Sequence, residues 1–162
     1  MSDYDTYLKA FDKMSDEEIA TTLLSETRQS ALVITDYALQ MASLIEQVDS
    51  AKLPEHLEED CQSLLNIATK IDQYLNLFPN IPEEHRLRLF TFEMKSPVSA
   101  LIGYAHLIPH TIENQDLSDL KRKFDYWCQE ILTITTRIKD MIDAAQTSRM
   151  PPNIRQEYEK RS

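Results

Sequence analysis

The side chains that could bind a metal ion or act as nucleophiles are few and scattered along the chain. There are two cysteines and four histidines. Cys61 and Cys128 are too few for a disulfide framework or a zinc site, and both fall on apolar stripes, so we interpret them as small core residues. The histidines are His56, His85, His106 and His110. None has further ligands at a spacing suited to a metal ion, so we expect no metal site and no cofactor.

Composition and net charge argue against several classes of fold and of partner. The 162 residues include a single glycine, Gly103. Strands, hairpins and phosphate-binding loops depend on glycine, which argues against β-rich, Rossmann and P-loop folds. The net charge is −10, which argues against nucleic acid or an anionic membrane as the partner. The sequence has no signal-peptide pattern and no apolar run near the ~20 residues that a membrane helix needs, so we expect a cytoplasmic protein without membrane insertion.

Apolar residues recur at steps of three and four in four segments, which predicts amphipathic helices. We expect these helices over 15–49, 54–78, 83–109 and 116–148. Ser15 and Glu18 have the spacing of a capping box at the start of the first helix. Because the connections are short, neighbouring helices should be antiparallel. The predicted fold is all-α, an antiparallel four-helix bundle.

The chain also contains an internal repeat with an offset of 67 residues. The pairs include Glu26 with Glu93, Tyr37-Ala38 with Tyr104-Ala105, and Cys61-Gln62 with Cys128-Gln129. A shared helical period explains matching leucines and isoleucines, but it does not explain these other identities. We infer a duplication, with tandem helical hairpins at 15–82 and 83–149 related by a pseudo-twofold axis.

The two ends of the chain lie outside this repeat. Residues 1–14 are predicted to be an N-terminal appendage. Residues 150–162 form a polar tail, for which we expect disorder; a short partner-binding segment is the alternative.

The third predicted helix carries a family resemblance. Its segment 90–105 reads FTFEMKSPVSALIGYA. This resembles the H-box of the dimerisation and histidine-phosphotransfer (HisKA-like) domain of sensor histidine kinases, where a phenylalanine precedes Ser-His-Glu-Leu-Arg-Thr-Pro-Leu and a stretch such as Ile-Ile-Gly-Tyr-Ala. Segment 138–149, IKDMIDAAQTSR, resembles the end of that domain's second helix. The resemblance covers 83–149 and, through the repeat, extends to 16–82. It implies two-component signalling, which is typical of bacteria.

The departures from the family pattern point away from kinase activity. The phosphoacceptor histidine is replaced by Phe92, and by Ser25 in the first copy. Phenylalanine has no nucleophilic nitrogen, and a serine hydroxyl is a poor substitute for imidazole. The thirteen residues after Arg149 are too few for an ATP-binding domain. We therefore expect a degenerate, duplicated pseudo-histidine-kinase module.

Other H-box elements are retained, and the resemblance gives them roles. In the family, the acidic residue after the histidine assists phosphotransfer, and the residue three positions beyond it orients water for dephosphorylation of the response regulator. These positions are Glu26 with Gln29, and Glu93 with Ser96. An amide or hydroxyl could hold the attacking water without a histidine, so phosphatase chemistry stays open as an alternative.

Our leading hypothesis is a non-catalytic module that binds a response-regulator receiver domain or a histidine kinase. The two copies differ, so one could be a competent docking face and the other not. The expected partner-binding residues are Ser25, Glu26, Arg28, Gln29, Phe92, Glu93, Lys95, Ser96 and Val98. A response-regulator phosphatase and a structural scaffold remain as alternatives, and a homodimer stays open.

Overall fold

The computed structural model describes residues 3–112 and 117–161, and every regular element among them is helical. The all-α prediction is therefore confirmed. Residues 1–2, 113–116 and 162 lie outside the described residues, and with them the predicted start of the fourth helix at 116. The α-helices are α1 Asp3–Phe11, α2 Asp16–Glu46, α3 Leu57–Leu77, α4 Glu83–Glu93, α5 Lys95–Thr111, α6 Ser118–Ser148 and α7 Pro152–Arg161. Two 3₁₀ turns, Ser50–Lys52 and Phe78–Asn80, flank α3.

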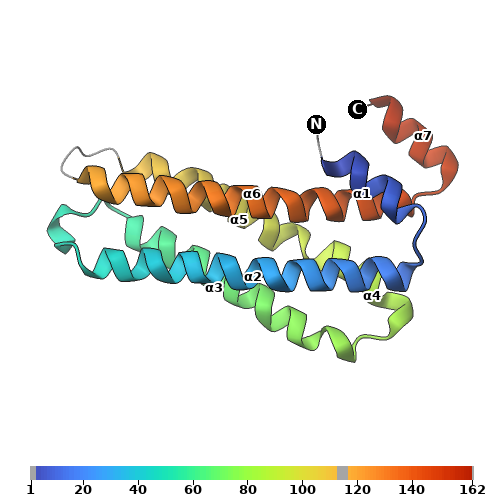
Figure 1. The fold of residues 1–162 in the computed structure, drawn as a ribbon, viewed down its shortest axis with the longest axis horizontal. Helices are drawn as coiled ribbons and strands as arrows, with labels where there is room; N and C mark the ends of the chain where they lie inside the picture. Colours follow the sequence, from blue (N-terminus) through green and yellow to red (C-terminus); the bar gives the residue numbers. More distant parts are fainter. Residues whose placement is uncertain (1–2, 113–116, 162) are drawn as a thin grey trace.

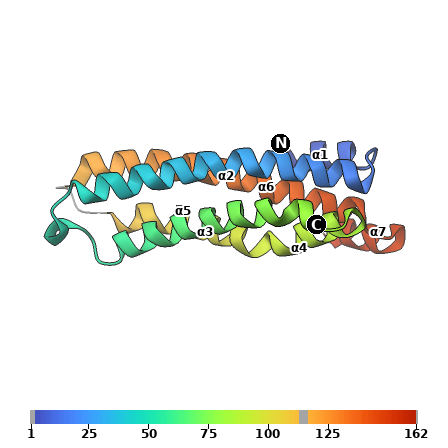
Figure 2. The same cartoon turned by 90° about the horizontal axis from the view of Figure 1, so that it is seen from below.

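The long helices lie alongside one another (Figures 1 and 2). Helix α2 packs against α3 and α6, and α5 packs against the same two helices. The α2–α6 pair and the α3–α5 pair are therefore on opposite sides of the molecule. Within the described ranges, no helix is long and apolar enough to cross a membrane.

The predicted capping box is present at the start of α2. The Glu18 backbone N–H donates to Ser15 Oγ at 3.1 Å, and the Ser15 N–H donates to Glu18 Oε1 at 3.1 Å. These bonds satisfy two donors that have no partner inside the helix. The capping box therefore predicted the start of this helix to within one residue.

The segment expected as one helix over 83–109 is divided at Met94 into α4 and α5. The cause is Pro97, which has no N–H to donate to the Glu93 carbonyl one turn earlier. Hydrogen bonding resumes at the next residue, where Val98 N–H donates to Met94 O at 3.1 Å. The first copy has Ser30 in place of the proline, and α2 runs unbroken over 31 residues.

Burial follows the internal repeat. Core positions of the first half have buried counterparts 67 residues later. The buried pairs include Leu23 with Phe90, Ile34 with Leu101, Ala38 with Ala105, Met41 with Ile108, Leu57 with Phe124, Cys61 with Cys128, Leu64 with Ile131 and Ile71 with Ile138. The offset seen in the sequence is thus also an offset in core position.

Both ends of the chain differ from expectation. Residues 3–11 are an integral helix: the side chain of Phe11 is 1% exposed, and Tyr4 Oη donates to Thr147 Oγ1 of α6 at 2.8 Å. The tail is helical rather than disordered, although α7 buries no residue. It is joined to Asp12, the residue that follows α1, by Arg155, whose guanidinium donates to both carboxylate oxygens of Asp12 at 2.9–3.0 Å. These tertiary contacts, which the local sequence does not reveal, hold both helices.

Candidate functional site

The H-box-like segment of the second copy lies at the junction of α4 and α5, on the surface. Phe92 is 73% exposed, although it is a large apolar side chain. Glu93, Lys95 and Ser96 are also exposed. Val98 is different: it is 2% exposed and belongs to the core, so its side chain is not available to a partner.

Glu93 and Ser96 line one groove, of about 340 Å³, between α3 and the α4–α5 junction. We call it the open groove. Its lining residues are Ile67, Lys70, Ile71, Tyr74, Glu93, Met94, Ser96, Pro97 and Ala100. Of the predicted residues, the structure therefore brings Glu93 and Ser96 together here.

Lys95 lines a different hollow, of about 210 Å³, between α5 and α6. There Lys139 Nζ pairs with Asp143 Oδ2 at 2.9 Å. Phe92 lies in the last turn of α4, and Lys95 and Ser96 are the first two residues of α5.

Tyr74 is a residue of the open groove that the sequence analysis did not single out. Its ring packs against Phe78 and Phe90, with centroids 6.5 Å from each. Its hydroxyl is buried and has no hydrogen-bond partner among the described residues. Burial raises the pKa of Tyr74, and the Glu93 carboxylate raises it further. The sequence feature that could have identified Tyr74 is its polar hydroxyl within the apolar stripe of 57–78.

The first copy has a different environment on α2. Ser25 and Gln29 are exposed. The Glu26 carboxylate lies 3.9 Å from Arg137 Nη2 of α6, and the same nitrogen lies 3.5 Å from Ser30 Oγ.

Two further interactions involve this first-copy segment. Arg28 reaches α3, where its Nη2 donates to the Leu75 carbonyl at 3.3 Å. Tyr7 of α1 is close to Glu26 and Arg137. Burial raises the pKa of Tyr7, the charge of Arg137 lowers it, and the charge of Glu26 raises it. Glu26 and Arg28 of the first copy therefore contact other helices of the chain, whereas Ser25 and Gln29 are exposed.

Catalytic chemistry has little support from the titratable groups. Burial raises the pKa of Cys61 and of Cys128 to about 12, so neither thiol is a thiolate nucleophile near neutral pH. No group of three or more His, Cys, Asp or Glu in the described part of the chain is arranged to hold a metal ion. The candidates that remain are the polar pairs of the two copies, Glu93 with Ser96 and Glu26 with Gln29.

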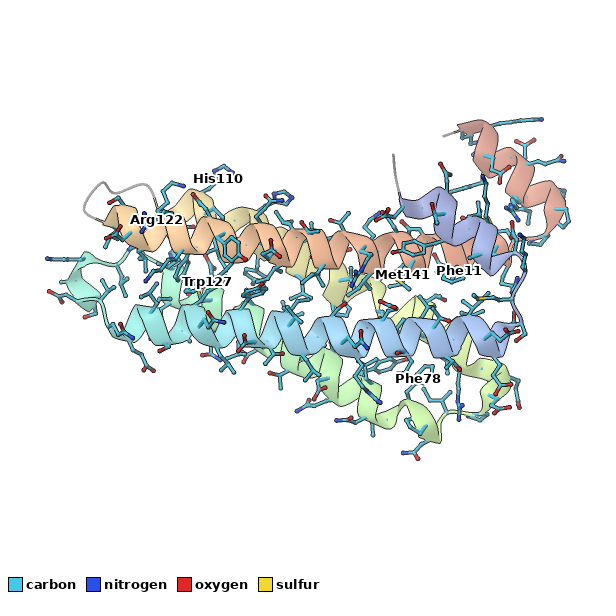
Figure 3. All side chains as sticks on the ribbon, viewed as in Figure 1. Phe11, Phe78, His110, Arg122, Trp127 and Met141 are labelled. Carbon is cyan, nitrogen blue, oxygen red and sulfur yellow. The ribbon has the colours of Figure 1, made fainter. Side chains whose placement is uncertain are left out.

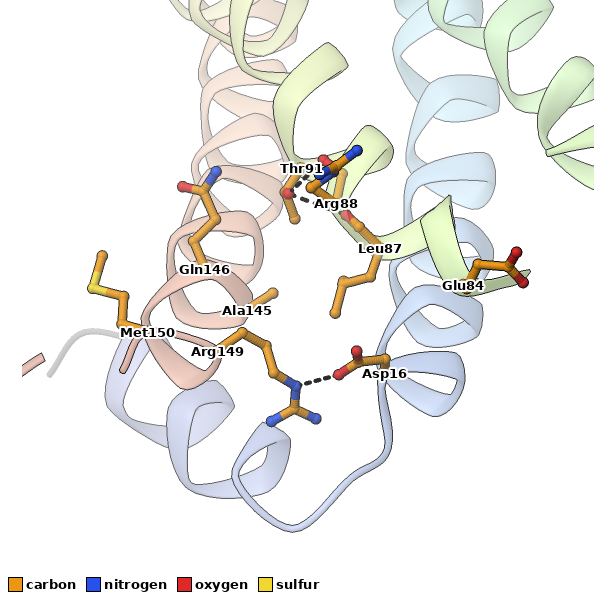
Figure 4. Close-up of a pocket in the computed structure, with 9 residues that line it drawn as sticks. All are labelled: Asp16, Glu84, Leu87, Arg88, Thr91, Ala145, Gln146, Arg149 and Met150. Atoms are coloured by element: carbon orange, nitrogen blue, oxygen red, sulfur yellow. Dashed lines mark hydrogen bonds and ion pairs between the residues drawn. The ribbon is translucent and has the colours of Figure 1, made fainter. Parts of the chain in front are cut away.

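A larger pocket, of about 510 Å³, lies between α4, the start of α2 and the end of α6 (Figure 4). Its charged side chains include Arg149, which forms an ion pair with Asp16 and also donates to the Met14 carbonyl. Thr91 Oγ1 is bonded to the Leu87 and Arg88 carbonyls of its own helix. The pocket contains none of the predicted site residues, and its Arg149, Asp16 and Thr91 are engaged in these contacts.

Comparison of the chain with protein-family models, with curated proteins and with solved structures finds no match in any of the three.

Proposed function

We propose that this chain is a non-catalytic, cytoplasmic pseudo-histidine-kinase module of two-component signalling. It binds a response-regulator receiver domain, or a sensor histidine kinase, through the second copy of its H-box-like segment. The observation that carries the proposal is Phe92, an apolar side chain 73% exposed beside Glu93, Lys95 and Ser96. An exposed aromatic side chain with charged neighbours is typical of a binding hot spot and its rim.

The proposal includes a fold and its symmetry. Helices α2 and α3, and helices α4–α5 and α6, are tandem hairpins of an antiparallel four-helix bundle with a pseudo-twofold axis. Two observations support this arrangement: buried positions recur at the offset of 67 residues, and α2 and α5 each pack against both α3 and α6.

The second copy is the docking face because the first is engaged. Glu26 lies near Arg137, Arg28 donates to α3, and Tyr7 of α1 stands beside them. A partner at the first copy would have to displace these contacts.

The test is direct binding of a panel of purified receiver domains and kinase phosphotransfer domains. The wild-type chain is compared with the double variant Phe92→Glu, Lys95→Glu and with Leu107→Glu, an exposed leucine on α5. Leu107 is twelve positions after Lys95, about 18 Å along a helix. We expect the double variant to bind at least about 30-fold more weakly and the control to bind as wild type. Equal binding by all three proteins, or no binding to any domain of the panel, would contradict the proposal.

Phosphatase activity is the second candidate, favoured by the shared groove of Glu93 and Ser96. The measurement is the decay of a phosphorylated receiver domain with wild type, Ser96→Ala and Gln29→Ala. A pure binding module leaves the decay unchanged in all three. Accelerated decay that is lost in one variant, with its binding retained, would establish the phosphatase. A scaffold would be indifferent to changes at either copy, in binding and in decay.

A further inference from the structure

The pocket of Figure 4 lies where α2 begins and α6 ends, with α4 as its third wall. We call it the α2–α4–α6 pocket. Its volume of about 510 Å³ is within the range of about 300–1,000 Å³ that is typical of small-molecule sites. Three helices that are far apart in the sequence therefore border a space of the size that a small organic molecule fills.

The pocket has room because a small residue stands where the other hairpin has a large one. Ala145 of α6 lines the pocket and is 1% exposed. The residue 67 positions earlier is Phe78, whose buried ring packs edge-on against Phe90 with centroids 5.6 Å apart. A phenyl ring thus takes up core volume just after α3, whereas Ala145 leaves space at the end of α6.

The inner wall of the pocket is apolar. Leu87 of α4 is half-buried, and its side chain projects toward Ala145 of α6 (Figure 4). Met150, which follows α6, is also half-buried and lines the same pocket. These side chains offer apolar surface to the body of a ligand, which gains free energy by leaving water.

One cation of the pocket is left without a partner. Asp16, Arg149 and Thr91 are bonded within the chain. Arg88 has no side-chain hydrogen bond or ion pair among the described residues. Glu84 is one helical turn before it, but the Glu84 carboxylate points away from the pocket and no ion pair joins these two described residues (Figure 4). Because Arg88 is exposed, its guanidinium stands at the open edge of the pocket, with the apolar wall further in.

We propose that the α2–α4–α6 pocket binds a small monocarboxylate with an apolar body, either an aliphatic chain or an aromatic ring. The carboxylate accepts hydrogen bonds from Arg88 at the edge, and the apolar body lies inward against Leu87 and Ala145. A guanidinium group matches a carboxylate in shape and charge, because it donates two parallel hydrogen bonds to the two oxygens. The pocket contains none of the predicted partner-binding residues, so this inference goes beyond the proposed function and does not depend on it.

Calorimetric titration with octanoate and 4-phenylbutanoate tests the site and separates an aliphatic body from an aromatic one. We expect saturable binding of at least one acid with a Kd below about 1 mM. The methyl signals of Leu87, Ala145 and Met150 should shift in nuclear magnetic resonance spectra on binding. The amides octanamide and 4-phenylbutanamide keep the body but lose the charge, and should bind at least about tenfold more weakly. No saturation by either acid, equal affinity of acid and amide, or shifts confined to other methyl groups would each overturn the inference.

Two variants of the pocket and one control identify the groups that bind. Arg88→Gln removes the cation and should weaken binding about tenfold. Arg122→Gln removes an exposed arginine toward the opposite end of the molecule from α1 and should leave binding unchanged (Figure 3). Ala145→Phe puts into the pocket the ring that position 78 carries, and should abolish binding in a protein that circular dichroism shows to be folded.

The exposed variant keeps the test valid if the buried one does not fold. Wild-type affinity in Arg88→Gln would refute the pairing with the carboxylate. Wild-type affinity in a folded Ala145→Phe protein would show that the acid binds elsewhere, and would overturn the proposed site.

Discussion

Replacing Phe11 with alanine tests whether α1 is part of the core. The Phe11 side chain is 1% exposed and stacks on Tyr7 with ring centroids 6.2 Å apart. Truncating a fully buried phenylalanine costs about 3–5 kcal/mol, the sum of lost transfer energy and the cavity left behind. Total stabilities are about 5–15 kcal/mol, so this loss is a large fraction of the whole.

Urea unfolding provides the assay. With a slope of about 2 kcal/mol per molar urea, we expect the midpoint of Phe11→Ala to fall by about 2 M. The chain's single tryptophan, Trp127, lies toward the opposite end of the molecule from Phe11 (Figure 3). Trp127 fluorescence should show the same shift as helical circular dichroism, because a cooperative core transmits the loss along its length. Ile154→Ala, on the exposed face of α7, is the control and should change stability by less than about 0.5 kcal/mol.

Two results would refute this reasoning. A change below about 0.5 kcal/mol for Phe11→Ala would mean that α1 is the loosely attached appendage that the sequence suggested. An early loss of helical signal while the Trp127 transition stays in place would mean that α1 unfolds by itself, without coupling to the core.

Three further predictions concern single groups. Tyr74→Phe should raise the free energy of unfolding by about 1 kcal/mol, because it removes a buried hydroxyl without a described partner; a clear decrease in chemical denaturation would show that the hydroxyl is satisfied. The thiols of Cys61 and Cys128, with pKa values of about 12, should resist Ellman's reagent at pH 8 in the native protein and react once urea unfolds it; rapid native labelling would contradict their burial. Hydrogen bonds from Arg155 hold the pKa of Asp12 below its ordinary value, so this pairing stabilises α7 above the unfolded pKa and is lost as pH falls through the folded pKa. Nuclear magnetic resonance signals of α7 should therefore show release from α1 below about pH 4 in wild type and already at pH 7 in Asp12→Asn; a pH-independent α7 would refute the link.

The elements that followed the sequence are those with strong local signals. The capping box at Ser15 and Glu18 predicted the start of α2, because its hydrogen bonds are made within one turn. The stripe through Cys61 and Cys128 predicted their burial, because the helical period alone decides which positions share a face.

The elements that departed from expectation depend on contacts between distant segments or, for the division of the 83–109 helix, on a proline. Helices α1 and α7 are short and would be marginal alone; Phe11 and the Asp12–Arg155 pair hold them in place. The division at Met94 follows from Pro97, which lies inside a segment whose apolar period predicted one continuous helix over 83–109.

The candidate site shows the same division between what local sequence predicts and what tertiary packing decides. The sequence alone selected Glu93 and Ser96 because their types and spacing match a known pattern, and Phe92 because it stands where that pattern has a histidine. It also selected Val98, which is buried in the core. It could not rank the two copies, because both carry the glutamate and a polar residue three positions on.

Periodicity and capping, which act over a few residues, let the sequence determine an all-α chain with repeated core positions. The tertiary structure decided which face α1 covers, which face stays open, and that Tyr74 stands in the open groove. The physical reason is that exposure depends on how segments far apart in the chain pack together. Two stretches with the same local pattern can therefore end in different environments, one covered by α1 and the other open.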